Sequence, residues 1–450
     1  MLDLGTPVPL GASSPLEGVL RAGKSVAALA ALTATLPVDL ALVTAALASR
    51  RRNPLSQYVS ETPRTVLITG GKMTKALQLA RSFHSAGHRV VLVESAKYRF
   101  TGHRFSRAVD AFHCVPEATA PGYAEAVRDV AVREGVDVFV PVSSPAASVH
   151  DARAGELVRH FCDVVHVDSS TVRMLDDKTQ FSDVAASLGL RIPDFRRITD
   201  AQQVVDFAFP AGREYILKRI AYNPVGRMDL TRLSSVTPER NAAFARSLGI
   251  SADDPWILQE FIEGQEYCTH GTVRDGWLQV YGCCESSAFQ INYGNVDKPE
   301  IRSWVEEFVG ALGITGQASF DFIEGRDGHA YAIECNPRTH SAITMFHDHP
   351  KVAAAYLEDG HPVITPRPRA RPTYWIYHEL WRLLAQRGRA HRLATILQGR
   401  DAIFTWWDPL PYLMVHHLQI PSLLVANLRR RGGWTRIDFN IGKLVEIGGD

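Results

Sequence analysis

Four polar side chains stand at short spacing within one apolar stretch of this 450-residue chain: Asp321, Glu334, Asn336 and Arg338. Two carboxylates and an amide oxygen form a set of hard ligands that suits Mg²⁺, which still needs further oxygens, such as those of phosphate, to complete its shell. A metal site completed by the phosphates of a substrate is what phosphoryl transfer requires. Arg338 could hold an anionic intermediate beside such a site.

The stretch that carries these side chains is predicted to be a β-hairpin. Two apolar runs, 318–323 and 330–333, flank the segment 325–328, which contains the Gly and Asp that turns require. Alternate residues of a strand share a face, so Glu334 and Asn336 project together. The alternative is a solvated hairpin whose acidic residues keep an edge strand soluble. That alternative explains poorly why four polar groups share one face of apolar strands.

Composition limits the class of protein. The length leaves room for about three domains of ~150 residues. The 49 Lys and Arg balance 48 Asp and Glu, so we expect no nucleic-acid partner. The six cysteines include no CxxC pair, which argues against a zinc site and a disulfide framework and favours a reducing, cytoplasmic location.

Two apolar segments near the ends of the chain resemble each other. Residues 26–48 are apolar but interrupted by Pro37 and Asp39, which predicts two short helices in place of one membrane-spanning helix. Residues 410–428 are also apolar, and three consecutive arginines follow each segment. The segments either pack together as a helical subdomain with the arginines in solvent, or make a peripheral membrane contact through their apolar faces.

A parallel α/β layer is predicted after the first apolar segment. Residues 65–93 have the pattern of a strand, a glycine turn, a helix and a second strand, and further strands are expected at 136–142 and 164–167. The glycine pair lacks the GxGxxG pattern, so we expect it only to make the turn. Ligands bind at the carboxyl ends of such strands. Candidate substrate contacts there are Lys72, Thr74, Lys75, Ser143 and Ser144.

Two lysines stand where a phosphate could pair with them. Lys178 falls in a predicted helix, 171–188, where a solvated charge is the simpler explanation. Lys218 falls within the apolar strand 214–220, where burying an unpaired ammonium would be costly. A phosphate anion would supply the missing partner.

Segment 256–267 predicts a strand that ends at Glu260 and passes into an extended connection. The backbone groups of Glu260 and Ile262 would then be free to pair with the edge of a ligand, and Glu266 could reach a sugar hydroxyl. A surface acidic turn is the alternative.

Taken in order, five phrases of the sequence resemble the ATP-grasp fold: DDK at 176–178, ILKRI at 216–220, LQEFIEGQEY at 258–267, SFDFIEG at 319–325 and AIECNPR at 332–338. The resemblance implies an α/β and α+β protein in which two α+β subdomains clamp ATP. The domains it implies are an apolar helical segment at 1–60, a pre-ATP-grasp α/β domain at 61–170, an ATP-grasp domain at 171–365 with a lid near 195–258, and a C-terminal extension at 366–450 that packs with the N-terminal segment.

The same resemblance implies a role for each candidate residue. The implied roles are Lys178 and Lys218 for the α- and β-phosphates, Gln259, Glu260 and Ile262 for adenine, Glu266 for the ribose, Asp321, Glu334 and Asn336 for Mg²⁺, and Arg338 for a phosphorylated intermediate. The lid loop after Lys218 departs from the family because it has a single glycine. Arg227 and Arg232 would cover the γ-phosphate instead.

Longer phrases, among them GGKMTKALQLARSFHSAGHRVVLVE and ECNPRTHSAITMFHDHP, resemble the ATP-grasp ligases of mycosporine-like amino acid biosynthesis. This family implies ATP, Mg²⁺, 4-deoxygadusol and glycine as the reacting partners. The γ-phosphoryl group would pass to the enol oxygen, and glycine would then displace phosphate. The base that deprotonates glycine could be His340, His347 or His349, and His340 is the first candidate because it is nearest to Arg338. Arg274 is a candidate for the acceptor pocket.

Two other functions stay open at this point. A carboxylate–amine ligase of the dipeptide type would use the same nucleotide residues with a different acceptor. An ATP-binding protein without turnover, docked on a membrane through its ends, would not need two carboxylates, an amide and an arginine together.

Overall fold

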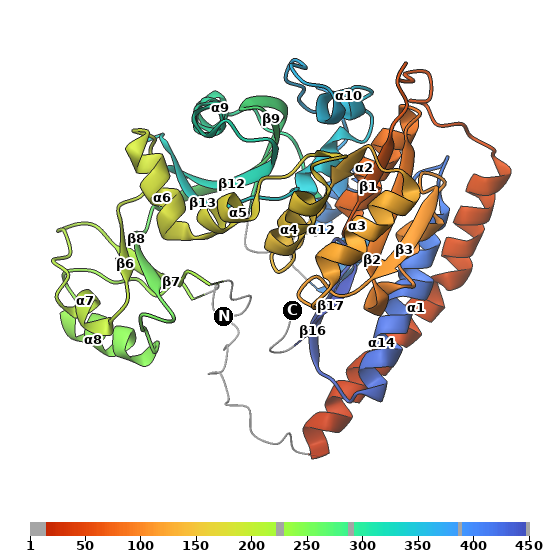
Figure 1. The fold of residues 1–450 in the computed structure, drawn as a ribbon. Coiled ribbons are helices and arrows are strands. Elements are labelled where there is room, and N and C mark those ends of the chain that lie inside the picture. The colour runs from red at the N-terminus through yellow and green to blue at the C-terminus, as the bar shows by residue number, and fades with distance from the viewer. Residues whose placement is uncertain (1–14, 222–228, 287–291, 386–388, 447–450) are drawn as a thin grey trace.

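The computed structural model describes residues 15–221, 229–286, 292–385 and 389–446. Figure 1 shows a parallel sheet in the body of the molecule, an antiparallel sheet beside it, and a small lobe that projects away from both. Two helices, α1 and α14, run along the opposite side. The predicted mixture of α/β and α+β structure is confirmed.

The body contains a five-stranded parallel sheet with strand order β3-β2-β1-β4-β5. Alternate residues of β1 enter different cores: Val66 and Ile68 pack with α2, and Leu67 packs with α3 and α4. Helices therefore cover both faces, as the predicted parallel layer requires. The elements are β1 Thr65–Ile68, α2 Thr74–Ser85, β2 Arg89–Ser95, β3 Ala111–Val115, α3 Tyr123–Glu134, β4 Val138–Val140, α4 Ser148–Val158 and β5 Asp163–Val164, with short 3₁₀ turns η1 Ala96–Tyr98 and η2 Gly102–Phe105.

The single helix predicted over 171–188 is wrong. The chain forms α5, Ser169–Asp176, and α6, Lys178–Ser187, which are separated at Asp177. Asp177 has an extended conformation, and its carboxylate accepts from the N–H groups of Thr179 and Gln180. An aspartate can therefore end one helix by capping the next. Lys178 consequently lies in the first turn of α6.

The small lobe has a three-stranded sheet with strand order β6-β8-β7, and its described residues also form two helices. Its core is buried around Tyr215, Leu217 and Leu258. The elements are β6 Phe195–Ile198, α7 Ala201–Val205, β7 Tyr215–Arg219, α8 Pro238–Ser247 and β8 Trp256–Glu260. The predicted strands around Lys218 and Glu260 are confirmed.

The antiparallel sheet has strand order β10-β9-β12-β13, and the predicted hairpin forms its β12-β13 edge. One face is buried under α6 and α9, where Phe181, Trp304, Phe308 and Phe320 pack ring against ring. The opposite face carries the polar residues of the hairpin. The elements are β9 Gly264–Arg274, β10 Trp277–Glu285, α9 Pro299–Leu312, β12 Gly316–Gly325, β13 Ala330–Asn336, η4 Ser341–Phe346 and α10 Val352–Leu357.

The apolar N-terminal segment forms one helix, α1, Pro15–Ala48, so the prediction of two short helices is wrong. Pro37 removes only one backbone donor from a long helix. On either side of it, Thr35 bonds to Tyr377 and Asp39 bonds to His417, so contacts with the C-terminal part hold the helix through the proline.

The C-terminal part packs against α1 and the parallel sheet. Its helical elements are α11 Ile376–Ala385, α12 Arg389–Gln398, α13 Leu410–Met414, the π-helical turn η5 Val415–Gln419 and α14 Ile420–Arg429. Its short strands are β14 Thr373–Tyr374, β15 Arg400–Asp401, β16 Trp434–Asp438 and β17 Lys443–Glu446, and β14 pairs with β11 Asn292–Tyr293.

Candidate active site

One row of side chains crosses the antiparallel sheet. Cys284 of β10 pairs directly with Cys268 of β9, Cys268 pairs with Asp321 of β12, and Asp321 pairs with Glu334 of β13. Directly paired residues project from the same face of a sheet. The two carboxylates singled out in the sequence are therefore neighbours, about 5 Å apart along the row.

The side chain of Asn336 lies close to both carboxylates of this pair. Its amide nitrogen Nδ2 lies 3.4 Å from Oδ2 of Asp321 and 3.4 Å from Oε1 of Glu334. Its oxygen Oδ1 accepts a short hydrogen bond from Arg338. The amide thus turns its donor group toward the carboxylates. To act as a metal ligand it must rotate so that its oxygen faces them, because a cation needs an acceptor there.

The electrostatic balance of the pair is uneven. Burial raises the pKa of Glu334, but Lys178, Lys218 and Arg338 together lower it to about 2. Burial and the charges of Glu334 and Glu266 raise the pKa of Asp321 well above its usual range. The cations of the protein outweigh burial at Glu334 but not at Asp321. Two acids so close together favour a divalent cation between them.

Three cationic side chains surround the carboxylates. Lys178 Nζ lies 3.5 Å from Oε2 of Glu334. Lys218 Nζ donates to Oε1 of the buried Gln259 at 3.1 Å, and burial lowers the pKa of this lysine. Arg338 donates to Asp176 at 3.0 Å. Because α6, β7 and the end of β13 converge here, residues 160 positions apart form one positively charged rim.

The structure corrects one expectation for the residues predicted to contact adenine. The N–H of Glu260 donates to the carbonyl of Asp194 at 2.8 Å, so it is not available to a ligand. Ile262 lies in the connection between β8 and β9, where the prediction placed it. Glu266, on β9, accepts from Ser286 at 3.2 Å and lies close enough to influence Asp321.

The candidate acceptor residues lie where the strand order of the parallel sheet reverses, between β1 and β4. This is the position at which open α/β sheets bind ligands. Lys72 Nζ lies 4.2 Å from the centre of the Tyr98 ring and 3.6 Å from Glu94. Ser143 donates to the buried Asp151 at 2.5 Å, and Ser144 is half-buried beside it.

The glycine turn at this edge is required by packing. Gly70 has φ of +67°, and a Cβ there would lie 2.1 Å from the carbonyl oxygen of Val142. Only glycine fits this turn, which agrees with the structural role expected for it.

Lys75 joins the two sheets. Its ammonium donates to the carbonyl of Ser143 at 3.0 Å and to the carbonyl of Thr339 at 2.6 Å, one residue beyond Arg338. Burial, with Arg338 and Lys72 nearby, lowers its pKa to about 7. The ligand-binding edge of the parallel sheet therefore faces the polar end of the hairpin.

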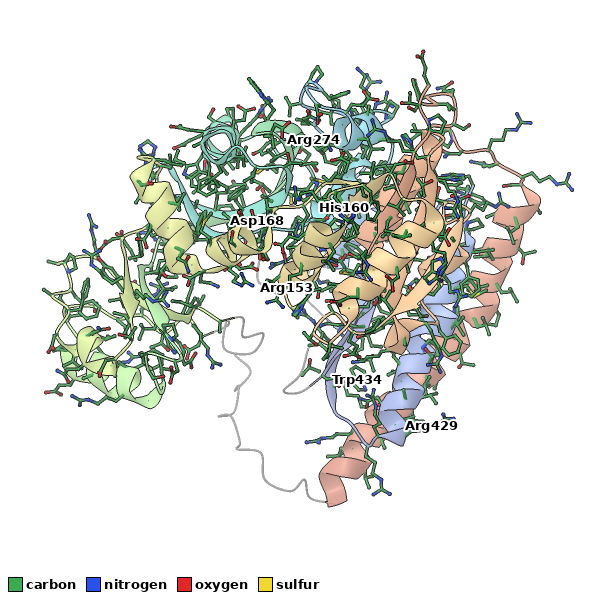
Figure 2. The ribbon with its side chains drawn as sticks, in the orientation of Figure 1. Arg153, His160, Asp168, Arg274, Arg429 and Trp434 are labelled. Carbon is green, nitrogen blue, oxygen red and sulfur yellow. The ribbon has the colours of Figure 1, made fainter. Side chains whose placement is uncertain are left out.

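Arg274 does not line this site. Its guanidinium pairs with Asp163 at 2.9 Å and with Asp359, and it donates to the carbonyl of Tyr356 at 3.0 Å. These partners account for a structural role where β9 ends, and Figure 2 places Arg274 at the upper edge of the molecule, near α10. The geometry gives no support to a role in an acceptor pocket.

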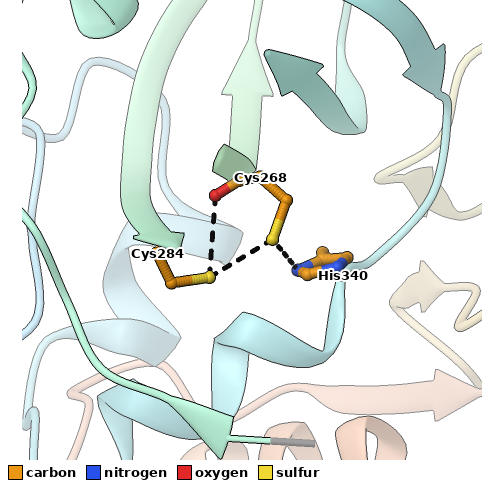
Figure 3. A group of neighbouring side chains, drawn as sticks. All are labelled: Cys268, Cys284 and His340. Atoms are coloured by element: carbon orange, nitrogen blue, oxygen red, sulfur yellow. Dashed lines mark hydrogen bonds between the residues drawn. The ribbon is translucent and has the colours of Figure 1, made fainter. Parts of the chain in front are cut away.

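His340 lies at the site but is unsuited to act as a base. Its Nδ1 accepts from the N–H of Ala342 at 3.2 Å, which requires the neutral ring to carry its proton on Nε2. Burial, with Lys75 and Arg338 nearby, lowers its pKa to about 3. Figure 3 shows the ring beside the Cys268 and Cys284 thiols, whose sulfur atoms are 3.3 Å apart. The geometry leaves His340 a donor from Nε2.

Two residues of the site were missed from the sequence. Asp176, the partner of Arg338, stands in the DDK phrase, but nothing local distinguishes it from Asp177. Asp151 accepts from Ser143, Tyr123 and Thr69, and its buried position follows only from the packing of α4. For the lid loop, Arg232 pairs with Glu214 at 2.8 Å, whereas Arg227 lies outside the described residues.

Comparisons with solved structures agree on the fold. The chain is similar to biotin carboxylase from Campylobacter jejuni, solved as a β-γ-ATP complex, at 17% identity over 66% of this chain and 72% of that one, with a TM-score of 0.51. It is also similar to the N5-carboxyaminoimidazole ribonucleotide synthetase purK, solved with ADP, at 14% identity over 70% and 81% of the two chains, with a TM-score of 0.51. The chain has the ATP-grasp fold.

Sequence comparison gives one distant relative among the matches. The chain is 23% identical over 193 residues to the large chain of carbamoyl phosphate synthase from Vibrio cholerae, which covers 39% of this chain and 17% of that protein. The chain thus spans less than a fifth of that relative. No family model matches the chain.

Proposed function

We propose that the protein is an ATP- and Mg²⁺-dependent ligase that forms a C–N bond and releases ADP and phosphate. The observation that carries this proposal is the Asp321–Glu334 pair, which lies among Lys178, Lys218 and Arg338. An oxygen ligand set within a cationic rim is the arrangement that holds a nucleoside triphosphate and its metal. The relatives named above support the same class.

In this proposal each charged residue has one task. Asp321, Glu334 and the rotated amide of Asn336 would hold Mg²⁺, which would neutralise charge on the transferring phosphoryl group. Lys178 and Lys218 would bind the α- and β-phosphates, and Gln259, Glu260 and Ile262 would line the adenine with Glu266 on the ribose. Arg338, oriented by Asp176, would bind the phosphorylated intermediate.

For the acceptor we propose 4-deoxygadusol, with glycine as the amine, on the basis of the resemblance to mycosporine-glycine synthetases. The enol oxygen would attack the γ-phosphorus of ATP and ADP would leave. The nitrogen of glycine would add to the carbon that carries the phosphate, and loss of phosphate and a proton would give the enaminone.

The edge between β1 and β4 would hold the acceptor, with Lys72, Ser143 and Ser144 as contacts. Lys75 fixes this edge against the end of the hairpin, which would bring the acceptor oxygen toward the γ-phosphate. The Nε2–H of His340 would donate to an oxygen of the ring. A ligase that joins a carboxylate to an amine would share the nucleotide residues and differ in these contacts.

We propose a cytoplasmic location with peripheral contact to a membrane. Cys268 and Cys284 are not joined by a disulfide although their sulfur atoms lie 3.3 Å apart, which supports a reducing compartment. The apolar surface of α1 supports the membrane contact.

The test is release of ADP by the purified protein with ATP, Mg²⁺ and 4-deoxygadusol, with and without glycine, monitored together with the near-ultraviolet absorbance of the product. ADP and a new chromophore that form only when both acceptors are present would support the proposal. If ADP forms with a panel of carboxylic acids but not with 4-deoxygadusol, the ligase class survives and the proposed acceptor is wrong.

A further inference from the structure

Helix α1 buries only a narrow stripe. Its most buried side chains include Ser25, Leu32, Asp39 and Ala46, which recur every seven residues and face the C-terminal helices. Only 17% of the most apolar part of this helix is buried. A core helix of a soluble protein would be mostly covered, so α1 leaves most of its circumference bare.

The bare surface of α1 is apolar along its length. Val26 is 56% exposed and Val38 is 70% exposed, with Leu36 and Leu40 beside them. Between Lys24 and Arg50 the sequence has one charged residue, Asp39, and that residue is buried. An apolar surface about 39 Å long without an exposed charge exceeds what single scattered side chains would give.

Anchors along the whole helix argue against a membrane-spanning position. Near its start, Ser25 accepts from the indole N–H of Trp434 at 2.8 Å. In the middle, Thr35 bonds to Tyr377 at 2.6 Å, and Asp39 accepts from His417 at 2.7 Å. A helix fixed to the protein along one side can offer only its other side to a membrane, and so must lie along the surface.

Exposed arginines mark both ends of this surface. Arg50, Arg51 and Arg52 follow the last turn of α1. Arg429 ends α14 near the N-terminal part of α1, and Arg430 and Arg431 follow it. Figure 2 shows Arg429 beside the N-terminal part of α1. The two clusters therefore flank the apolar surface, where each can meet an anionic group.

The first cluster forms a hollow. It has a volume of about 400 Å³ and is lined by Arg50, Arg51, Arg52, Asn53, Ser56, His84, Arg107 and Trp407. No carboxylate is among these lining residues. Arg107 is held in place because its N–H donates to Asp408 and its guanidinium donates to the carbonyl of Trp407, each at 2.9 Å. Such a hollow suits the phosphate of a lipid headgroup.

We infer that the bare surface of α1 lies on an anionic phospholipid bilayer, with the arginine hollow over a lipid phosphate. A second copy of the chain fits less well. A two-fold pairing of α1 helices would set arginines against arginines, because both ends of the surface carry the same charge. This inference does not depend on the reaction that the site catalyses.

The test is flotation of the full-length protein with two kinds of vesicle. One contains phosphatidylcholine with about 30% of the anionic lipid phosphatidylglycerol, and the other contains phosphatidylcholine alone. We expect the wild type to float with the anionic vesicles, and less so at high salt. The double variant Val26→Glu/Val38→Glu should bind at least about tenfold more weakly. The triple variant Arg50→Ser/Arg51→Ser/Arg52→Ser should bind about a hundredfold more weakly.

Matched variants distinguish membrane binding through α1 from a general effect of an added charge and from an effect of lost turnover. Val132 is 63% exposed on α3, so Val132→Glu should float as the wild type does. Glu334→Gln should also float, even if it lacks turnover. Wild-type protein that stays unbound with both vesicle types would overturn the inference, and so would equal flotation of the double variant. A dimer by light scattering that the double variant abolishes, without vesicle binding, would show that a second copy covers α1.

Discussion

Two carboxylates of the molecule, Asp39 of α1 and Asp321 of the hairpin, have contrasting surroundings. Asp39 of α1 accepts hydrogen bonds from Tyr377 at 2.6 Å, Tyr412 at 3.2 Å and His417 at 2.7 Å. Burial alone would raise its pKa, but the bonds from His417 and Tyr377 lower it. At the hairpin, Asp321 instead faces Glu334, and burial beside this second acid raises its pKa well above the usual range.

The difference distinguishes a structural charge from a binding charge. Asp39 has its partners within the protein, so it fixes α1 to the C-terminal helices and needs no ligand. The hairpin acids repel each other, and the cations around them outweigh burial at Glu334 but not at Asp321. A buried charge that the protein leaves unbalanced costs stability unless a ligand compensates it. The following predictions test that contrast.

Removal of a hairpin carboxylate should abolish activity without unfolding the protein. We expect Glu334→Gln to lower the rate of ADP formation by more than about 100-fold, since residues that only orient metal ligands already contribute about 10–100-fold. Its melting temperature should fall only modestly, because loss of the attraction to Lys178, Lys218 and Arg338 is partly offset by removal of the repulsion with Asp321. Glu307→Gln, an exposed change on α9, is the control and should behave as wild type. Retained activity in Glu334→Gln would contradict the metal assignment.

The reverse outcome is expected at Asp39. Asp39→Asn leaves the His417 contact without its anion and should lower the free energy of unfolding by about 3 kcal/mol. Activity per folded molecule should stay near wild type below the melting transition. Urea denaturation followed by circular dichroism measures the loss, with the exposed Asp253→Asn as the control. A loss of activity at full folding would show that α1 takes part in the site.

Acid should destabilise the fold through its buried histidines. Burial lowers the pKa of His103 and His166 to about 4, and that of His270 and His416 to about 3. The unfolded chain binds protons near pH 6.5, so stability is fully present above that pH and falls as the pH drops toward these folded values. Each histidine costs about 1.4 kcal/mol per pH unit in this window. The melting temperature should fall steeply from pH 6.5 to 5, whereas a flat profile would contradict the burial of neutral rings.

The smallest effect concerns one hydrogen bond beside Pro37. Thr35→Val removes the bond to Tyr377 but keeps the size of the side chain, so it should lower the free energy of unfolding by about 1 kcal/mol. Thr33→Val is the comparison, because the Thr33 hydroxyl bonds within α1 to the carbonyl of Leu29. If both variants lose the same stability, the contact with Tyr377 does not hold the helix.

Local pattern explains which elements could be predicted. The hairpin and the β-α-β unit follow from alternation, helical periodicity and turn residues within 30 positions. Asp39 was interpreted from the sequence as a helix breaker, because its partners lie 338 to 378 residues away. Its burial is decided by the packing of α11, α13 and η5, which no local pattern encodes.

The residues of the candidate site also fall into those that a local pattern predicts and those that depend on the packing of distant segments. Asp321, Glu334 and Asn336 could be grouped because one hairpin positions them. The pairing of Cys268 with Asp321 and the contact of Lys75 with Thr339 depend on which strands and domains meet. The unsuitability of His340 as a base likewise follows from a backbone N–H that only the folded turn directs at Nδ1.

The most direct test is the thermal shift produced by ADP with and without Mg²⁺ in wild type, Glu334→Gln and Asp39→Asn. Ligand at 100 times its dissociation constant should stabilise the folded state by about 2.7 kcal/mol. We predict that Mg²⁺ adds to the shift in the wild type and equally in Asp39→Asn, from a lower starting temperature, but adds nothing in Glu334→Gln. An equal Mg²⁺-dependent shift in Glu334→Gln would show that the hairpin carboxylates do not hold the metal.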